Sequence, residues 1–272
     1  MQKEIILTLK NEICPKLVTE EKQQRIEQLV KTIPSLTEGL LYWLNRAIQV
    51  FDSPHQFKVQ SSNLLDETTL ANFGDALRIH HSFSVEPFSK DKFEYVLEKV
   101  LKMSGHEALL APKGNRGHDI TIDGFPISLK TQADKNIRED KIWISKFMEL
   151  GKGKWGDDDD DLLVLRQMFL DHLKNYHRIL TLRAFKKAPQ WCYELVEIPK
   201  VLMEEAKNGE LEMKKGSKQF PKPGYCYVRT QEGEDIYQLY FDAGSERKLQ
   251  VKNLLKSHCT VHATWEFFIP PE

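Results

Sequence analysis

Apolar residues recur at helical spacing through the first part of the chain. Four fall on one helical face and four repeat the pattern after a break at Pro34 and Ser35: Ile26, Leu29, Val30 and Ile33, then Leu40, Leu41, Leu44 and Ile48. No residues here have the spacing of a catalytic motif. We therefore expect residues 1–75 to form an α-helical N-terminal region.

The pattern changes after Phe88. A helix is expected from Ser89 to Met103, because its apolar residues form one stripe, Ser89 suits a helix start and Gly105 suits a helix end. Two short strands are expected next, at 108–111 and 118–122. Asp123 and Gly124 then give the strongest hairpin-turn signal in the chain, which leads into a partner strand at 126–131.

The remaining pattern mixes one helix with several strands. The helix is expected at 162–173, and the strands at 178–185, 191–198, 225–228, 236–241 and 260–268. A basic loop containing Gly and Pro occupies residues 214–224. We therefore predict an α/β fold, with residues 76–272 forming one domain around a mixed sheet.

Composition narrows the class of protein. The chain has 272 residues, of which 40% are hydrophobic and 29% charged, as in a globular protein. No apolar run approaches the roughly 20 residues of a membrane span, and charges interrupt the first residues where a signal peptide needs an apolar core. We expect a cytoplasmic protein. The cysteines lack zinc-site spacing and are expected to be reduced: Cys14, Cys192, Cys226 and Cys259.

The hairpin in GHDITIDGFPISLKTQ carries the candidate chemistry. Asp119 lies on its first strand, whereas Ser128 and Lys130 share one face of the second strand because side chains alternate with a period of two. Hydrolysis of a phosphodiester needs carboxylates to hold a divalent cation and benefits from a further cation near the attacking water. The hairpin supplies a carboxylate and a lysine in that arrangement.

These residues resemble the PD-(D/E)xK nucleases, and among them the type II restriction endonucleases. The resemblance covers roughly residues 93–132: a helix with Phe93 and Glu94, a glycine, the strand RGHDI, a turn and the strand ending in SLKT. It implies a restriction-endonuclease-like core, a central mixed β-sheet flanked by helices, that cuts double-stranded DNA at specific sites with Mg²⁺. It also implies a bacterial homodimer with its DNA methyltransferase on a separate chain. The N-terminal helices would then support the fold, dimerise or embrace DNA.

The sequence departs from the family pattern at Ser128, which stands where a second acidic residue is expected. Serine is a poor metal ligand, so a carboxylate from elsewhere must complete the site. Glu94, on the preceding helix, is our first choice as metal ligand or water-positioning residue. In some restriction endonucleases with an SxK element a later helix supplies the carboxylate, and here Glu139 is the second choice, with Glu149 in reserve.

Two other sets of residues are interpreted as structural. The run Asp157 to Asp161 consists of contiguous like charges that do not share a face, and we interpret it as a solvated segment before a helix. The histidines have no partner nucleophile and no metal-binding spacing, and we interpret them as surface or hydrogen-bonded core residues: His80, His81, His172, His177, His258 and His262.

Candidate DNA contacts come from clusters of basic residues, because the net charge of −1 says nothing about where Lys and Arg gather. Lys113 and Arg116 precede Asp119 and suit phosphates near the scissile bond. Lys215 and Lys218 lie in the basic loop. Arg247 and Lys248 follow a glycine turn, and Arg138 lies after the catalytic strand; both arginines are candidates for a base or phosphate contact.

Three other functions fit the same residues. A repair, nicking or modification-dependent nuclease would use the same site. A DNA-binding protein that has lost catalysis would explain Ser128. An unrelated α/β protein whose hairpin only mimics the motif would not bind DNA at all.

Overall fold

The computed structural model describes residues 19–60, 62–112, 114–115, 117–134, 136–151, 155–187 and 189–271. The chain separates into two compact units at Asp52/Ser53. In the first unit, helices α2 (Glu20–Thr32) and α3 (Glu38–Asp52) are joined by the short 3₁₀ helix η1 (Ile33–Ser35). The expected helices and the break at Pro34 are confirmed. The functional division expected at residues 75/76 stays a prediction.

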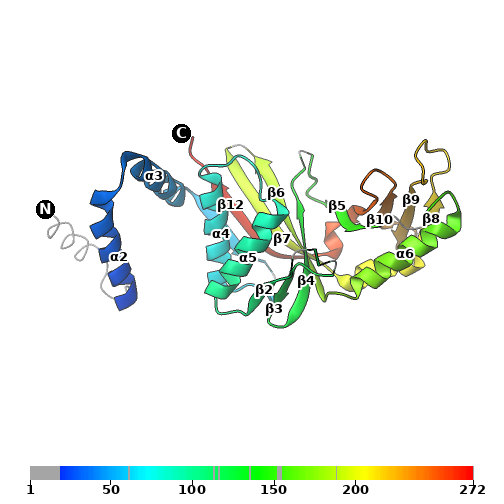
Figure 1. Ribbon diagram of the computed structural model, residues 1–272, viewed down its shortest axis with the longest axis horizontal. Coiled ribbons are helices and arrows are strands. Elements are labelled where there is room, and N and C mark those ends of the chain that lie inside the picture. The colour runs from blue at the N-terminus through cyan, green and yellow to red at the C-terminus, as the bar shows by residue number, and fades with distance from the viewer. Residues whose placement is uncertain are drawn as a thin grey trace. The chain divides into compact units, whose positions relative to one another are not determined.

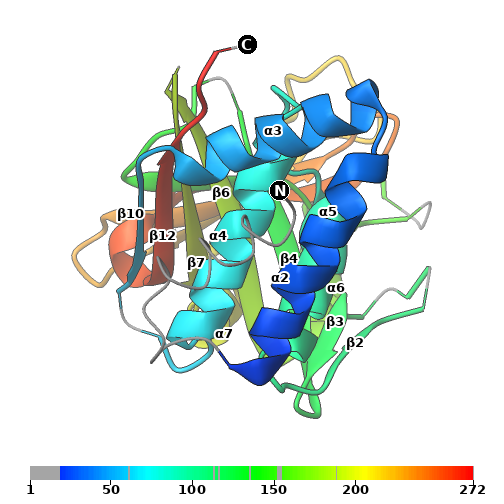
Figure 2. The same ribbon diagram turned by 90° about the vertical axis from the view of Figure 1, so that its left-hand side faces the viewer.

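The second unit is built on a seven-stranded sheet with the order β1-β12-β7-β6-β4-β3-β2. Its strands are β1 (His55–Val59), β2 (Ala108–Leu110), β3 (Ile120–Ile122), β4 (Phe125–Gln132), β6 (Arg178–Lys187), β7 (Gln190–Ile198) and β12 (Thr260–Phe268). β4 and β6 run parallel and the other neighbours antiparallel, so the sheet is mixed. Figure 2 shows β12, β7, β6, β4, β3 and β2 in this order across the view, with helices α4 (Glu67–His81) and α5 (Lys90–Met103) in front of them.

A second sheet has five strands in the order β5-β11-β10-β9-β8. These are β5 (Lys141–Glu149), β8 (Glu210–Met213), β9 (Gly224–Arg229), β10 (Asp235–Asp242) and β11 (Lys248–Leu255). Helix α6 (Asp159–Leu173) lies beside this sheet (Figure 1). The short helices α7 (Lys200–Glu204), η2 (Glu205–Asn208) and η3 (Lys256–His258) make connections between strands.

The seven-stranded sheet separates two hydrophobic cores. On one face, α4 and α5 bury Phe73 and Phe93 against Leu129 and Leu180. On the other face, Ile179 packs with α6 and with the second sheet. Alternate residues of β4 therefore face different cores, which is why Leu129 is buried among apolar side chains while Ser128 and Lys130 face the side of α6 and β5. This mixed sheet flanked by helices is the expected architecture and is consistent with a restriction-endonuclease-like core.

Several local predictions can be compared directly with the structure. Ser89 caps α5 by accepting the N–H of Lys92, as expected. The aspartate run does not precede α6 entirely: Asp158 is the cap, and Asp159 to Asp161 form the first turn, where negative charge suits the helix dipole. Cys192, Cys226 and Cys259 are not joined by disulfide bonds, and Cys14 lies outside the described residues. None of the helices described is long and apolar enough to cross a membrane.

Candidate active site

Asp119 lies where β3 separates from β4. Its backbone N–H donates to the carbonyl of Ile127, 3.0 Å away, and this is the last ladder bond between the two segments. Farther along β4, the N–H of Leu129 donates to Oδ2 of Asp119 over 2.6 Å. The end of the hairpin therefore fixes the carboxylate against the edge of β4.

Ser128 and Lys130 complete the hairpin part of the site. The Ser128 hydroxyl donates to Oδ2 of Asp119 over 3.2 Å and accepts from Nζ of Lys130 over 2.9 Å. Nζ of Lys130 lies 3.9 Å from Oδ2 of Asp119. Ser128 thus connects the carboxylate to the ammonium group, a role that its hydroxyl can fill although it is a weak metal ligand.

Helix α5 brings a second carboxylate to the same place. Nζ of Lys90 lies 2.5 Å from Oδ1 of Asp119 and 3.1 Å from Oε1 of Glu94. Lys90 and Glu94 are four residues apart, one turn along the helix face that looks toward the end of β3. The carboxylates of Asp119 and Glu94 therefore share one cation, which here is the ammonium group of Lys90.

Burial and neighbouring charges shift the pKa values of these groups in opposite directions. Burial alone would raise the pKa of Asp119, but the charges of Lys130 and Lys90 and its hydrogen bonds hold that pKa below its ordinary value. Burial raises the pKa of Glu94 despite the nearby Lys90. Burial lowers the pKa of Lys130 to about 8, against the opposing effect of Asp119. Perturbed carboxylates and a perturbed lysine in contact are typical of a catalytic site.

The wall opposite the hairpin is aromatic. Nζ of Lys130 lies 5.3 Å from the ring centre of Phe147 on β5, and Phe147 lies edge-on to His172 of α6. Burial and the charge of Lys130 lower the pKa of His172 to about 4, so this imidazole is neutral near pH 7. The hydroxyl groups of Tyr176 and Thr181 are buried on this side without a hydrogen-bond partner in the described part of the chain. The site is thus shielded from solvent on the side of α6.

The donor set fits a hard divalent cation. Asp119 and Glu94 already hold one positive group between them, and both offer oxygen ligands. Among the described residues no group of three His, Cys, Asp or Glu side chains is placed to hold a metal ion. Mg²⁺ commonly binds through one or two carboxylates, with water and substrate phosphate as further ligands, so two carboxylates are enough.

Glu139 and Glu149 lie outside this group. Glu139 is exposed and lies in the loop before β5. The six-residue step along β5 from Lys141 to Phe147 alone covers roughly 20 Å at about 3.3 Å per residue, so Glu139 lies far along the sheet from Phe147. Glu149 pairs with Lys146 over 2.8 Å. The structure therefore brings Glu94, and not Glu139, to Asp119.

The turn between β10 and β11 approaches the site. It carries Arg247, whose backbone has a φ of 43°. It leads into Lys248, the first residue of β11, which lies opposite Glu149 in the ladder between β11 and β5. The charges of both Glu246 and Lys90 act on Lys146, so the turn and the start of α5 both lie near that lysine. Arg247 and Lys248 are neighbours of Glu246 in this part of the chain.

The other candidate DNA contacts are more scattered. Lys215 pairs with Asp159 over 2.7 Å, and Lys218 is exposed in the same loop between β8 and β9. Arg138 is exposed and pairs with Asp140 over 2.7 Å. Lys113 and Arg116 lie outside the described residues.

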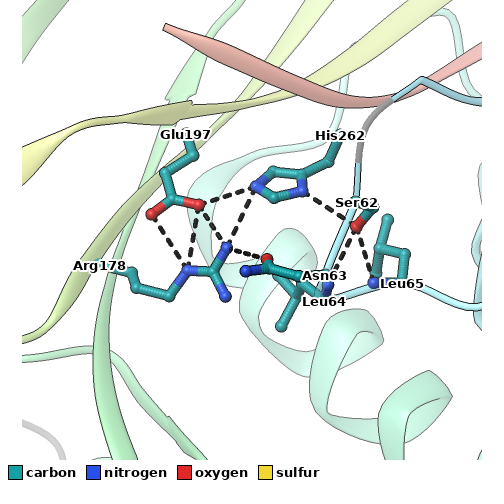
Figure 3. Close-up of polar contacts among 7 residues, drawn as sticks. All are labelled: Ser62, Asn63, Leu64, Leu65, Arg178, Glu197 and His262. Atoms are coloured by element: carbon teal, nitrogen blue, oxygen red, sulfur yellow. Dashed lines mark hydrogen bonds and ion pairs between the residues drawn. The ribbon is translucent and has the colours of Figure 1, made fainter.

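A second polar cluster, at the far end of β6 and β7, has the residue types of a serine hydrolase site (Figure 3). Ser62 Oγ lies 3.0 Å from Nδ1 of His262, whose Nε2 lies 2.8 Å from Glu197. However, Ser62 Oγ also accepts the N–H groups of Leu64 and Leu65, and Arg178 pairs with Glu197. His262 is 1% exposed, so the cluster fastens the loop before α4 to the sheet, and the interpretation of this histidine as hydrogen-bonded core is confirmed.

Lys90 is the residue of the site that sequence reasoning missed. The available signal was its i, i+4 spacing to Glu94, which places both side chains on one helix face. That spacing is common on solvated helices, and only the position of α5 against β3 makes it part of a site. Phe147 was missed because β5 itself was not predicted.

Comparisons with known proteins identify the family to which the chain is similar. A family model described as SmaI, type II site-specific deoxyribonuclease, matches residues 21–267. The type II restriction enzyme SmaI of Serratia marcescens is 44% identical over 236 residues, which cover 86% of this chain and 92% of that protein. No solved structure matches the chain.

Proposed function

The chain belongs to the SmaI family of type II site-specific deoxyribonucleases, and we propose that it cuts double-stranded DNA with Asp119, Glu94 and Lys130 as its catalytic residues. The observation that carries this assignment is the shared cation. Two carboxylates from separate elements hold one ammonium group, with Lys130 3.9 Å from Asp119.

Each residue has a separate task in this proposal. Asp119 and Glu94 hold Mg²⁺, which when bound polarises the phosphate and lowers the pKa of water. Lys130 donates hydrogen bonds to the scissile phosphate or to the attacking water and offsets the negative charge that develops there. Ser128 positions Lys130 through its hydroxyl. Lys90 leaves the two carboxylates and turns toward a DNA phosphate, which its 41% exposed side chain can reach.

Removal of divalent metal tests the proposed chemistry as a whole. Purified protein with plasmid DNA and Mg²⁺ is expected to give discrete fragments, whereas excess EDTA is expected to leave the plasmid intact, because the two carboxylates alone do not activate water. Gel electrophoresis of the products measures both. Undiminished cutting in EDTA would contradict a metal-dependent site.

Substitution of two glutamates, one at a time, tests which residue supplies the second carboxylate. Glu94→Gln is expected to lower kcat by about 100-fold or more, since a charged ligand is lost from the site. Glu139→Gln is the matched control and is expected to stay within about two-fold of the wild type, since exposed groups away from a site contribute little. Single-turnover cleavage as a function of Mg²⁺ concentration measures both variants. The reverse ranking would assign the ligand to Glu139.

DNA contacts are proposed at two distances from the scissile bond. Arg247 and Lys248 are proposed to contact a base or phosphate near the cut, because the neighbouring Glu246 and the active-site Lys90 both act on Lys146. Lys113 and Arg116 precede Asp119 in the chain and are proposed to bind phosphates next to it. Lys215 and Lys218, on an exposed loop, suit more distant phosphates, and Arg138 is proposed to contact a base or a phosphate.

The proposed assembly is a homodimer, because a two-fold axis matches the symmetry of a palindromic site. Helices α2 and α3 support a role in dimerisation because several of their large apolar side chains are exposed, among them Leu29, Leu40, Trp43 and Ile48. The cognate DNA methyltransferase is proposed to be a separate protein. Residues 76–272 are proposed as the catalytic and recognition domain.

A further inference from the structure

A pocket of about 400 Å³ lies beyond the end of β4. Its lining comes from β4, from the loop that follows, from β5 and from β11, and includes Gln132, Asn136, Arg138, Trp143, Lys252 and Asn253. We call it the β4–β5 pocket. Gln132 is two residues from Lys130 on the same face of β4, so the pocket begins about 7 Å from the catalytic lysine along the strand.

A buried arginine builds this pocket. Arg183 is 0% exposed; its Nε donates to Oε1 of Gln132 over 2.9 Å, and its Nη2 donates to the carbonyl of Lys141 over 2.8 Å and to that of Arg138. Glu194 neutralises the guanidinium by an ion pair. These bonds fasten the loop after β4 to the sheet. Because the oxygen of Gln132 is taken by Arg183, its NH₂ group is the part of the amide left to donate to a ligand.

The opposite side of the pocket is formed by an irregular stretch of β11. Pairing with β5 shifts register between Val251 and Leu254, and Asn253 has a φ of 53°. Such irregularities redirect side chains and cluster near functional sites. Here the irregular stretch places Lys252 and Asn253 in the lining of the pocket.

The chemistry of the lining suits a nucleobase. Side-chain amides such as those of Gln132 and Asn253 match the donor and acceptor groups on base edges. Trp143 is 39% exposed and presents an aromatic surface that favours a base or a thymine methyl group. Arg138 pairs with Asp140, and the remaining charges of the lining, Lys141 and Lys252 against Asp134, leave a positive excess that also favours a phosphate backbone.

We infer that the β4–β5 pocket binds the edge of a DNA base near the scissile phosphate, and that Gln132 and Asn253 are specificity-determining residues. This inference rests on the proposed active site at Lys130. The separation of about 7 Å corresponds to about two base-pair rises of 3.4 Å, so the contacted base lies within the recognition site close to the cut.

Two variants test the inference while preserving the hydrogen bond from Arg183 and the backbone conformation at residue 253. Gln132→Glu keeps an oxygen for Arg183 but replaces the NH₂ donor by an acceptor. Asn253→Gly removes an amide while allowing the positive φ. Gln167→Glu, an exposed amide on α6, is the matched control. Thermal unfolding of each variant reports whether it is folded.

The measurement is the sequence of cut sites. Randomised duplex DNA is digested with Mg²⁺ and the new ends are sequenced, which gives the preference for the wild-type site over sites with one changed base pair. Gln132→Glu and Asn253→Gly are each expected to lower this preference about 10- to 100-fold at one position, while Gln167→Glu leaves it unchanged.

Four outcomes are distinguishable. Wild-type preference in both folded variants would overturn the inference, as would a loss of cutting at every sequence with binding of the cognate site retained, which would make these residues catalytic. Cutting by a Lys130→Met variant at the wild-type rate would overturn the active-site assignment instead. A lowered preference at one base-pair position with Lys130→Met inactive supports both.

Discussion

Replacing Lys130 by methionine is expected to lower the rate of DNA cleavage by about 1,000-fold or more, because removal of a buried charge-stabilising donor at a reacting phosphate costs that order of magnitude. Lys130 is 7% exposed and its ammonium group lies between Ser128, Asp119 and the ring of Phe147. Methionine keeps the unbranched apolar stem against Phe147 and removes only the charge and its hydrogen bonds.

The Lys130→Met variant is expected to bind DNA close to wild-type strength, since one phosphate contact among many contributes a small part of the affinity. Single-turnover cleavage and a binding assay without metal measure the two quantities separately. Lys99→Met, an exposed lysine on α5, is the matched control and is expected to cut like the wild type. A folded Lys130→Met protein with nearly full activity would remove this lysine from the mechanism.

Replacing Asp119 by asparagine is expected to lower the cleavage rate by a similar factor, about 1,000-fold or more, and to weaken metal binding as well. The amide oxygen can still accept the N–H of Leu129, so the end of the hairpin is preserved. The substitution removes the negative charge that pairs with Lys90. The same charge raises the pKa of Lys130 against the effect of burial, and this contribution is lost as well.

Metal binding distinguishes Asp119 from a purely structural residue. Isothermal titration with Mn²⁺ in the presence of DNA is expected to show clearly weaker binding to Asp119→Asn than to the wild type and to Lys130→Met. Asp235→Asn, an exposed carboxylate on β10, is the control. Equal metal affinity in Asp119→Asn and the wild type would show that another residue carries the metal.

Local signals in the sequence were sufficient for the hairpin that carries Asp119, Ser128 and Lys130. Asp123 and Gly124 both have a positive φ, as their turn requires. The apolar residues on either side of the turn recur with the two-residue period of a β-strand. The stripe of α5 and its cap at Ser89 were equally readable. These features depend on neighbours within a few residues, which is why they could be predicted.

The rest of the site depends on contacts between segments far apart in the chain. β5 pairs with β11 across about one hundred residues, so the strand that carries Phe147 has no local turn signal. Lys90 joins the site only because α5 packs against the sheet through Phe93. Arg183, which builds the β4–β5 pocket, appears in the sequence as one more residue of a β-rich segment.

The position of the bound metal tests the central claim most directly. A crystal of the Lys130→Met variant with DNA and Mn²⁺, with the metal located by anomalous scattering, is expected to show Mn²⁺ bound by the carboxylates of Asp119 and Glu94, with Lys90 moved away from both. Metal bound by Glu139 or Glu149 instead of Glu94, or Lys90 still held between the two carboxylates in the presence of DNA and Mn²⁺, would contradict it.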